Sequence, residues 1–245
     1  MEEKNFSWDN SQSKYENNNK KSLPIFYDFY DLSNDFKNVY EPAEDTFLLI
    51  DSITNELINE KNKNNFINPI KSIEIGCGNG LVSCCYLDIL KQEKIKLEKH
   101  FCIDINKDAL NLTEKLIKNY NLNNNVFFIE SDLFSNFKNN EKFDLIIFNP
   151  PYVTTNDDEY KRALEKKDIY ASWAGGKKGS ETIFKFIYQL KNFIKDNSII
   201  YLLLSKENEY FKIINDIYNC INFQFEILMK RKAINEKLAV FKFFK

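Results

Sequence analysis

Short apolar runs alternate along the chain with segments in which apolar residues recur at helical spacing. The runs predict strands, and the amphipathic segments between most of them predict helices. Strands separated by helices form βαβ units, which build a parallel sheet with right-handed crossovers. The expected strands are Lys71–Ile75, Phe101–Ile105, Val126–Ile129, Asp144–Phe148, Ser198–Leu204, Phe223–Leu228 and Leu238–Phe244. The expected helices are Glu44 to about Glu60, Val82–Leu90, Asp108–Tyr120, Thr182–Ile194 and Tyr210–Tyr218.

No helical pattern separates the last two expected strands, so they predict an antiparallel hairpin at the end of a doubly wound, mostly parallel α/β sheet. Residues 1–38 are polar and rich in Asn, apart from a short apolar island at Leu23–Tyr30. We therefore expect an N-terminal tail or loosely docked arm over 1–38 and one α/β domain over 39–245. Loops are expected at the Asn- and Lys-rich runs Asn59–Asn68, Asn119–Asn125 and Asn136–Glu141.

Composition supports a globular protein and argues against some partners. Hydrophobic residues are 43% of the 245 residues, which supplies a sizeable core. The net charge of -2 argues against a protein that holds nucleic acid mainly by overall charge. Two local basic clusters, Lys161–Lys167 and Lys230–Lys232, are interpreted as solvated faces. No run approaches the roughly 18 apolar residues of a membrane span. The N-terminus carries no apolar signal segment, so we expect a soluble intracellular protein.

The cysteines and the single histidine limit the possible chemistry. The chain has 5 cysteines, and none are spaced as C-x-x-C. An odd number without a secretory signal predicts a reducing compartment and free, mostly buried thiols. His100 is the only histidine, which excludes histidine-based triads and sites with several histidine ligands. We therefore expect no metal site.

A glycine cluster follows the first expected strand and opens a helix. It reads Gly76-Cys77-Gly78-Asn79-Gly80 and lacks both the spacing of dinucleotide binders and the ending of a phosphate loop. Glycines let the backbone approach a ligand closely, next to unpaired N–H groups at the helix start. Glu74 stands two positions before the first glycine. Because its carboxylate repels phosphate, this turn suits a cationic or hydroxyl-bearing ligand.

Further acids follow the next two expected strands. Asp104 ends the second strand, where doubly wound folds hold ribose hydroxyls. Glu130 and Asp132 follow the third strand. Ligands of open α/β sheets bind beside these strand ends. The ordered set of acids with the glycine turn therefore predicts an adenosine site without phosphates. The alternative interpretation is that they are ordinary strand-ending acids in loops.

The fourth expected strand ends in Asn149-Pro150-Pro151-Tyr152. Asn149 precedes a proline and is held extended. The two prolines lack N–H donors but keep their carbonyls. The loop therefore presents acceptors, and a planar –NH2 group can donate one hydrogen to the Asn149 oxygen and one to a proline carbonyl. Tyr152 adds an aromatic wall. The alternative is a simple stop between strand and loop, where Asn-Pro is common.

Three segments together resemble one enzyme family. They are Val39–Leu49, containing Y-E-P-A-E-D-T-F, the N-P-P-Y-V run, and Ala171–Gly176, containing W-A-G-G. The chain resembles class I S-adenosylmethionine-dependent methyltransferases, and more closely the eukaryotic HemK-type glutamine methyltransferases of the class 1 peptide release factor. N-P-P-Y is shared with adenine methyltransferases, whereas the other two segments are much more specific. The resemblance covers about 39–245 and implies a seven-stranded methyltransferase sheet.

The resemblance also implies a role for each motif residue. The cofactor would be S-adenosylmethionine, giving S-adenosylhomocysteine without a metal. Thr46 would contact it, Glu74 and Gly76 would hold its amino-acid end, and Asp104 its ribose. Asp132 and Leu133 would hold the adenine. Asn149 would contact both cofactor and substrate. The catalytic set implied is Asn149, Pro150 and Tyr152, and the substrate-binding set adds Pro151.

The resemblance further implies partners and a location. The substrate would be the glutamine of the Gly-Gly-Gln motif in the release factor, in the cytoplasm, with the nucleus as a second location. The expected edge strand Val126–Ile129 is four apolar residues without protecting Lys or Pro, so it invites strand pairing. The cover implied is a small zinc-binding activator subunit. We expect no membrane and no nucleic-acid partner.

Three alternatives stay open. An adenine amino-methyltransferase acting on DNA or RNA would use the same N-P-P-Y loop, but the net charge and the lack of a base-reading module argue against it. A protein-lysine methyltransferase would also fit the loop. A non-catalytic protein that keeps the fold is opposed by the complete set of acids and N-P-P-Y.

Overall fold

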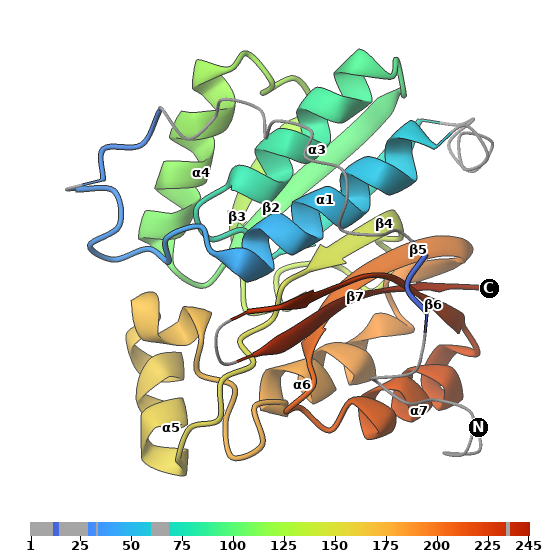
Figure 1. Ribbon diagram of the computed structural model, residues 1–245. Helices are drawn as coiled ribbons and strands as arrows, with labels where there is room; N and C mark the ends of the chain where they lie inside the picture. The colour runs from blue at the N-terminus through green and yellow to red at the C-terminus, as the bar shows by residue number, and fades with distance from the viewer. Residues whose placement is uncertain (1–11, 15–28, 33, 60–68, 234–235) are drawn as a thin grey trace.

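The computed structural model describes residues 12–14, 29–32, 34–59, 69–233 and 236–245. A seven-stranded sheet lies at the centre, in the order β3-β2-β1-β4-β5-β7-β6, with helices on both faces (Figure 1). The strands are β1 (Ile70–Ile75), β2 (Leu97–Asp104), β3 (Val126–Glu130), β4 (Phe143–Phe148), β5 (Ile194–Ser205), β6 (Gln224–Lys232) and β7 (Lys237–Phe244). The helices are α1 (Glu44–Ile58), α3 (Leu81–Gln92), α4 (Lys107–Asn119), α5 (Asp157–Lys166), α6 (Glu181–Leu190) and α7 (Tyr210–Ile221), with a short 3-10 helix η4 (Ile169–Ser172).

The sheet has the predicted topology. Strands β1 to β5 pair in parallel, while β7 pairs antiparallel with both β5 and β6. This confirms the expected doubly wound sheet with a C-terminal hairpin. Glu74 on β1 is in register with Cys102 on β2 and Ile147 on β4. The carboxyl ends of the central strands therefore meet at one edge, where the predicted acids and the N-P-P-Y loop come together.

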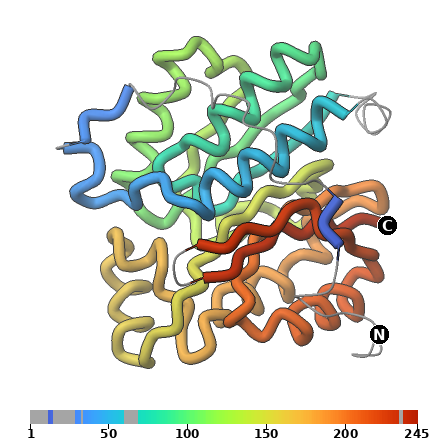
Figure 2. The backbone as a smooth tube through the Cα atoms, viewed as in Figure 1, coloured from blue at the N-terminus to red at the C-terminus, as the bar shows by residue number. Residues whose placement is uncertain are grey.

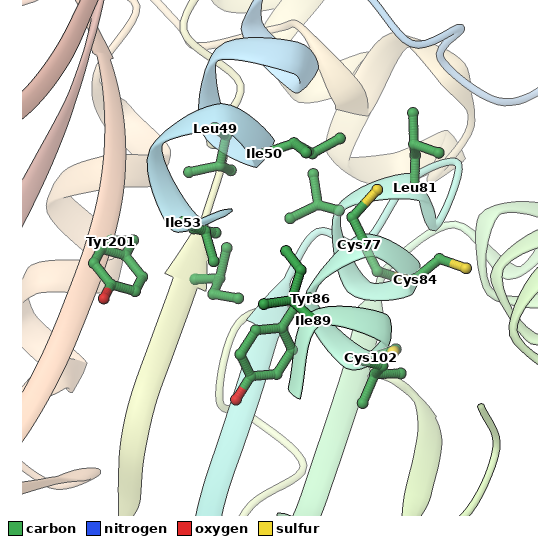
Figure 3. Close-up of a cluster of buried hydrophobic side chains, with 14 of the residues drawn as sticks. Leu49, Ile50, Ile53, Cys77, Leu81, Cys84, Tyr86, Ile89, Cys102 and Tyr201 are labelled. Atoms are coloured by element: carbon green, nitrogen blue, oxygen red, sulfur yellow. The ribbon is translucent and has the colours of Figure 1, made fainter. Parts of the chain in front are cut away.

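Two hydrophobic cores pack against the two faces of the sheet. Helices α1, α3 and α4 cover one face, and α6 and α7 cover the other (Figure 1). Central strands are buried on both sides, as in parallel sheets generally, so Leu145 and Ile146 are both fully buried although they point to opposite faces. Figure 3 shows part of the first core, where side chains of α1 and α3 meet Cys102 and Tyr201 from the sheet.

The thiols are free and mostly buried, as expected. Cys77, Cys84, Cys85 and Cys102 lie in the first core, and only Cys220 is half-exposed. Burial raises the pKa of the Cys84 thiol to about 12, which keeps it protonated and unreactive.

Helix α6 is shorter than predicted. Its pattern predicts a helix to Ile194, but α6 ends at Leu190 and β5 begins at Ile194. The reason is Phe193, whose ring stacks on Phe134 with centroids 4.3 Å apart and whose carbonyl accepts from the Phe143 N–H. Apolar residues that continue the helical spacing belong instead to the turn before the next strand.

Helix α5 was not predicted at all. Its start is fixed by a capping box, in which the Asn156 side chain accepts from the Glu159 N–H and the Glu159 side chain accepts from the Asn156 N–H. Ala163 is its only buried residue, so the helix has no apolar periodicity to reveal it. The basic residues of Lys161–Lys167 lie exposed on and after this helix.

The described parts of the N-terminal segment contact the domain. Tyr30 is buried, and its hydroxyl donates to the Asn79 carbonyl at 3.0 Å. The Lys14 N–H donates to the Ile227 carbonyl at 2.8 Å, so residues 12–14 lie beside β6 (Figure 2). Most of the apolar island and of the expected loop Asn59–Asn68 lies outside the described residues. The boundary at residue 38 between the N-terminal arm and the α/β domain stays a prediction. In the described part of the chain, no helix is long and apolar enough to cross a membrane.

Candidate active site

One cavity opens at the carboxyl ends of the central strands. Its empty volume is about 1060 Å³, including a part open to solvent, which is room for a ligand of nucleoside size. Its wall includes the following predicted site residues: Thr46, Glu74, Gly76, Asp104, Asp132, Leu133, Asn149 and Pro151. Pro150 and Tyr152 are not part of the wall. The cavity thus collects residues from the start of α1, the glycine turn and the ends of β2, β3 and β4.

Asp104 shapes the glycine turn. One carboxylate oxygen accepts from the Gly78 N–H and the other from the Asn106 N–H, both at 2.9 Å. Gly80 has a φ of +84°, and a Cβ there would lie 2.7 Å from the Thr113 Cα on α4. Only glycine tolerates both the backbone conformation and the close approach to that helix. The turn is therefore held by an acid at the end of β2 and by its packing on α4.

Two acids, the buried Glu74 and the partly buried Asp104, set the electrostatics of the cavity. Burial and, to a smaller extent, the neighbouring Asp104 carboxylate raise the pKa of the Glu74 carboxyl to about 8, although the hydrogen bond from the Ser83 hydroxyl lowers it. Burial also raises the pKa of Asp104, although backbone N–H groups at Gly78 and Asn106 lower it. Two such carboxyl groups favour the binding of a ligand that brings positive charge or hydroxyl donors.

The loop after β3 forms another part of the wall. Asp132 is exposed at the cavity, while Leu133 is buried and holds a φ of +51°. The Ser131 hydroxyl donates to the Leu133 carbonyl at 2.8 Å and so fixes this conformation. A carboxylate beside an apolar side chain suits a flat ring with an amino group at its edge.

Asn149 presents an unused acceptor. Its Nδ2 donates to Asp45 Oδ2 at 2.9 Å, while its Oδ1 is buried without a hydrogen-bond partner. Asp45 is itself held, because its Oδ1 accepts from the Thr46 N–H at 2.8 Å. A buried acceptor without a partner is costly, so it marks a place for a donor from a ligand. This arrangement leaves Asn149 ready to accept from an –NH2 group.

Tyr152 turns toward the C-terminal hairpin. Its hydroxyl donates to Glu236 Oε2 at 3.1 Å. Burial and the nearby Asp45 and Glu236 carboxylates raise the pKa of the Tyr152 phenol, so it stays protonated. Neither Pro150 nor Tyr152 forms part of the cavity wall, so their expected roles remain proposals.

The W-A-G-G segment braces the N-P-P-Y loop. The Val153 N–H donates to the Trp173 carbonyl at 2.9 Å, and the Gly175 N–H donates to the Val153 carbonyl at 2.8 Å. At Gly179, with a φ of +67°, a Cβ would lie 2.1 Å from the Tyr152 carbonyl oxygen. The N-P-P-Y loop and the W-A-G-G segment therefore form one structural unit.

Sequence reasoning missed several residues of the site. Asp45 lies inside the Y-E-P-A-E-D-T-F segment, but nothing in its spacing reveals a contact with Asn149. The wall formed by α5 and η4, with Leu164 and Asp168, has no apolar periodicity that predicts it. Asn79 and Asn106 follow the predicted glycines and acid and also line the cavity.

The residues fit S-adenosylmethionine. The cavity offers acids for an ammonium group and for ribose hydroxyls, open backbone at the glycine turn, and no phosphate loop. Among the described residues there is no cluster of His, Cys, Asp and Glu that could hold a metal ion. Fold and site together define a class I methyltransferase.

Comparison with known proteins names the family. Residues 49–166 match the model of the methyltransferase small domain. The chain is 38% identical to a putative protein N5-glutamine methyltransferase, MJ0928, of Methanocaldococcus jannaschii, over 82% of this chain and 89% of that protein. It is 30% identical to the eRF1 methyltransferase catalytic subunit mtq2 of Schizosaccharomyces pombe and 31% identical to methyltransferase HEMK2 of Homo sapiens, each over 86% of this chain and 91% of the relative. The chain belongs to this family of S-adenosylmethionine-dependent protein-glutamine methyltransferases.

Solved structures support the fold. The E. cuniculi Mtq2-Trm112 complex, described as methylating the eRF1 translation termination factor, superposes with a TM-score of 0.55 at 22% identity, covering 84% of this chain and 98% of that chain. A T. thermophilus 16S rRNA methyltransferase, RsmC, in complex with AdoMet and guanosine, has a TM-score of 0.52 at 11% identity, over 84% of this chain and 44% of that chain. At these identities the likeness concerns the fold alone.

Proposed function

We propose that this protein methylates the side-chain amide nitrogen of the glutamine in the Gly-Gly-Gln motif of a eukaryotic class 1 release factor. The observation that carries the proposal is the unpartnered Oδ1 of Asn149, a residue of the cavity wall whose amide is held by its hydrogen bond to Asp45. The relatives named for this activity support the same substrate. A release factor acts at the ribosome, so a cytoplasmic location belongs to the proposal.

The cofactor is assigned to one half of the cavity. Glu74 and the turn at Gly76 would hold its cationic amino-acid end, and Asp104 its ribose hydroxyls. Asp132 and Leu133 would hold the adenine, and Thr46 would close the site from α1. The cofactor supplies an electrophilic methyl group on a sulfonium.

The protein would act on the amide mainly by positioning it. An amide nitrogen is a poor nucleophile because its lone pair is shared with the carbonyl. Asn149 Oδ1 and the Pro150 carbonyl would each accept one amide N–H, which fixes the nitrogen and increases its electron density. Acceptors that are already in place cost no rearrangement during reaction. His100 is buried beneath the cavity between two serines, so it is not available as a base.

Asp45 is assigned as the residue that positions Asn149. Without its carboxylate, the Asn149 amide would rotate and lose the orientation of its acceptor. For Asp45→Ala we expect kcat to fall roughly tenfold to a hundredfold, as for a lost hydrogen bond to a charged group. Glu44→Ala, one residue earlier and exposed, is the control and should keep its rate. Equal kcat values for the two variants would rule out this role.

A second candidate substrate is a lysine side chain. Asp45 lines the cavity and hydrogen-bonds to Asn149, so a carboxylate lies beside the acceptor site. A competition assay separates the candidates, with release factor, a lysine-containing peptide, DNA and RNA offered together to the enzyme. We expect label on the release factor, located by mass spectrometry on a glutamine amide. Preferred labelling of lysine would move the proposal to the second candidate, and salt-sensitive labelling of nucleic acid would overturn both.

The exposed edge of β3 is proposed to bind a small zinc-binding activator subunit. Within the described residues, strand β3 is the last strand at its end of the sheet and pairs only with β2. Phe127 is 43% exposed and rests on Phe101, with ring centroids 5.3 Å apart, whereas Phe128 is half-buried against the first core. An apolar edge of this kind needs a cover. The structurally similar Mtq2 of E. cuniculi forms a complex with a partner, Trm112.

Phe127→Glu is therefore expected to prevent the activator subunit from copurifying with this protein, because the substitution places a charge in an apolar contact. Loss of the subunit should lower solubility or activity. Tyr188→Glu is a suitable control, since Tyr188 is an aromatic residue that is 70% exposed on α6. Copurification in equal yield from both variants would contradict the assignment, as would full activity of the chain alone.

A further inference from the structure

A chain of buried hydrogen bonds runs from the core to the cofactor site. Ser72 on β1 contacts His100 Nδ1 at 2.8 Å, and Ser83 on α3 contacts His100 Nε2 at 2.8 Å. The Ser83 hydroxyl also hydrogen-bonds to Glu74 Oε2 at the cavity. Ser72, Ser83 and His100 are fully buried, and Glu74 is 2% exposed. Four polar side chains thus form one continuous row of hydrogen bonds, which is fully buried except where Glu74 lines the cavity.

The histidine in this row is neutral. Burial lowers the pKa of His100 to about 3. A neutral imidazole has one N–H donor and one acceptor nitrogen, so it cannot donate to both serines. Serine hydroxyls donate one hydrogen and can also accept. The donor and acceptor roles along the row therefore all run the same way, and the protonation state of Glu74 at one end decides which way.

Two arrangements satisfy the contacts among these four side chains, and in both the Ser83 oxygen can also accept from the Cys102 thiol at 3.3 Å. With Glu74 ionised, Ser72 donates to Nδ1, the Nε2–H donates to Ser83, and Ser83 donates to the carboxylate. With Glu74 protonated, the carboxyl donates to Ser83, Ser83 donates to Nε2, and the Nδ1–H donates to Ser72. The imidazole carries one proton in both arrangements. They differ by one proton on Glu74 and by the tautomer of His100.

We propose that this row is a positioning relay, in which Glu74 loses a proton and His100 changes tautomer when the cationic end of the cofactor binds. The inference rests on the proposed role of Glu74 in the cofactor site. The proton leaves to the buffer. Ser83 then donates to the carboxylate and holds it in place for the ligand. Ser83, Ser72 and His100 act through Glu74 and do not touch the cofactor.

The surroundings of Glu74 favour this change. The groups that interact with its charge are acidic or neutral, and they come from β2, α3, the glycine turn and the N-terminal segment: Asp104, Cys77, Cys85, Cys102 and Tyr30. Burial and Asp104 raise the pKa of Glu74 to about 8, so the proton stays on Glu74 in the free protein at neutral pH. A ligand cation stabilises the carboxylate and removes that proton.

The single histidine makes the test direct. Its two ring ¹⁵N resonances in the wild-type protein report the tautomer without any assignment problem. At pH 6 without cofactor we expect the Nδ1–H form. Raising the pH through 8, or saturating the protein with cofactor at pH 6.5, should convert it to the Nε2–H form. A tautomer that stays the same under all these conditions would overturn the relay.

Calorimetry and a variant complete the test. Cofactor binding measured at pH 7 in buffers of different ionisation heat should release close to one proton. Ser83→Ala breaks the row and should remove the effect of pH and cofactor on the His100 tautomer, and cofactor affinity should fall about tenfold. Ser52→Ala is the control, because Ser52 is an equally buried serine that donates to Leu48 on α1.

The outcomes separate the two proposals. If calorimetry detects no cofactor binding, the proposed function fails, while the pH titration of the free wild-type protein still decides whether Glu74 and His100 are coupled. A Ser83→Ala protein that still changes tautomer with pH would overturn the relay even where the cofactor binds normally. If Ser83→Ala does not fold, the pH titration of the wild-type protein still tests whether Glu74 and His100 are coupled.

Discussion

Asn149→Ala is expected to abolish methyl transfer and to change cofactor affinity much less. The structure gives the physical reason, because Asn149 Oδ1 is a buried acceptor without a partner and Asp45 holds it in place. Removing a preorganised group of this kind costs on the order of 10²–10³ in kcat. The measurement is steady-state transfer from labelled cofactor, with calorimetry of cofactor binding in parallel.

The matched control is Asn197→Ala, on the exposed first part of β5 far from the cavity wall. This variant should retain the full rate. An Asn149→Ala protein with a rate near wild type would show that the proposed mechanism is wrong. A loss confined to cofactor affinity would move Asn149 from the acceptor site to the cofactor site.

Asp104→Ala should weaken cofactor binding at least tenfold while the fold survives. Loss of the carboxylate removes charge-assisted acceptors, each worth roughly 1.5–3 kcal/mol. It also leaves the Gly78 and Asn106 N–H groups without their acceptor, so the glycine turn itself loses its support. The effect therefore combines a lost ligand contact with a displaced turn.

Calorimetry measures this affinity, and circular dichroism checks that the variant is folded. Asp196→Ala is the control, since Asp196 is an exposed acid that pairs only with the surface residue Lys245 among the described ion pairs. Unchanged affinity for Asp104→Ala would remove Asp104 from the cofactor site.

Much of the fold follows from the sequence because buried parallel strands leave a clear signal. Leu145–Phe148 is an apolar run that must be covered on both faces, and the structure buries it entirely. The order of Glu74, Asp104 and Asp132 along the chain predicts their meeting, since parallel strands bring their carboxyl ends to one edge. Local pattern and global topology agree at these positions.

The rest depends on tertiary contacts that no local pattern contains. Asp45 and Asn149 are 104 positions apart in sequence, and their hydrogen bond exists only once α1 lies beside the end of β4. The motif predicts the ring of Tyr152 at the cavity, whereas in the structure its hydroxyl donates to Glu236 on the C-terminal hairpin. Helix α5 is stabilised by its cap and by a single buried alanine, so apolar periodicity does not reveal it.

The proposed methyl acceptor is a glutamine amide nitrogen. The most direct measurement is transfer of a labelled methyl group from S-adenosylmethionine to purified release factor by this protein together with the proposed partner subunit. Wild-type release factor should take up label, and release factor with its Gly-Gly-Gln glutamine replaced by alanine should take up none. Equal labelling of the two substrates would contradict the account.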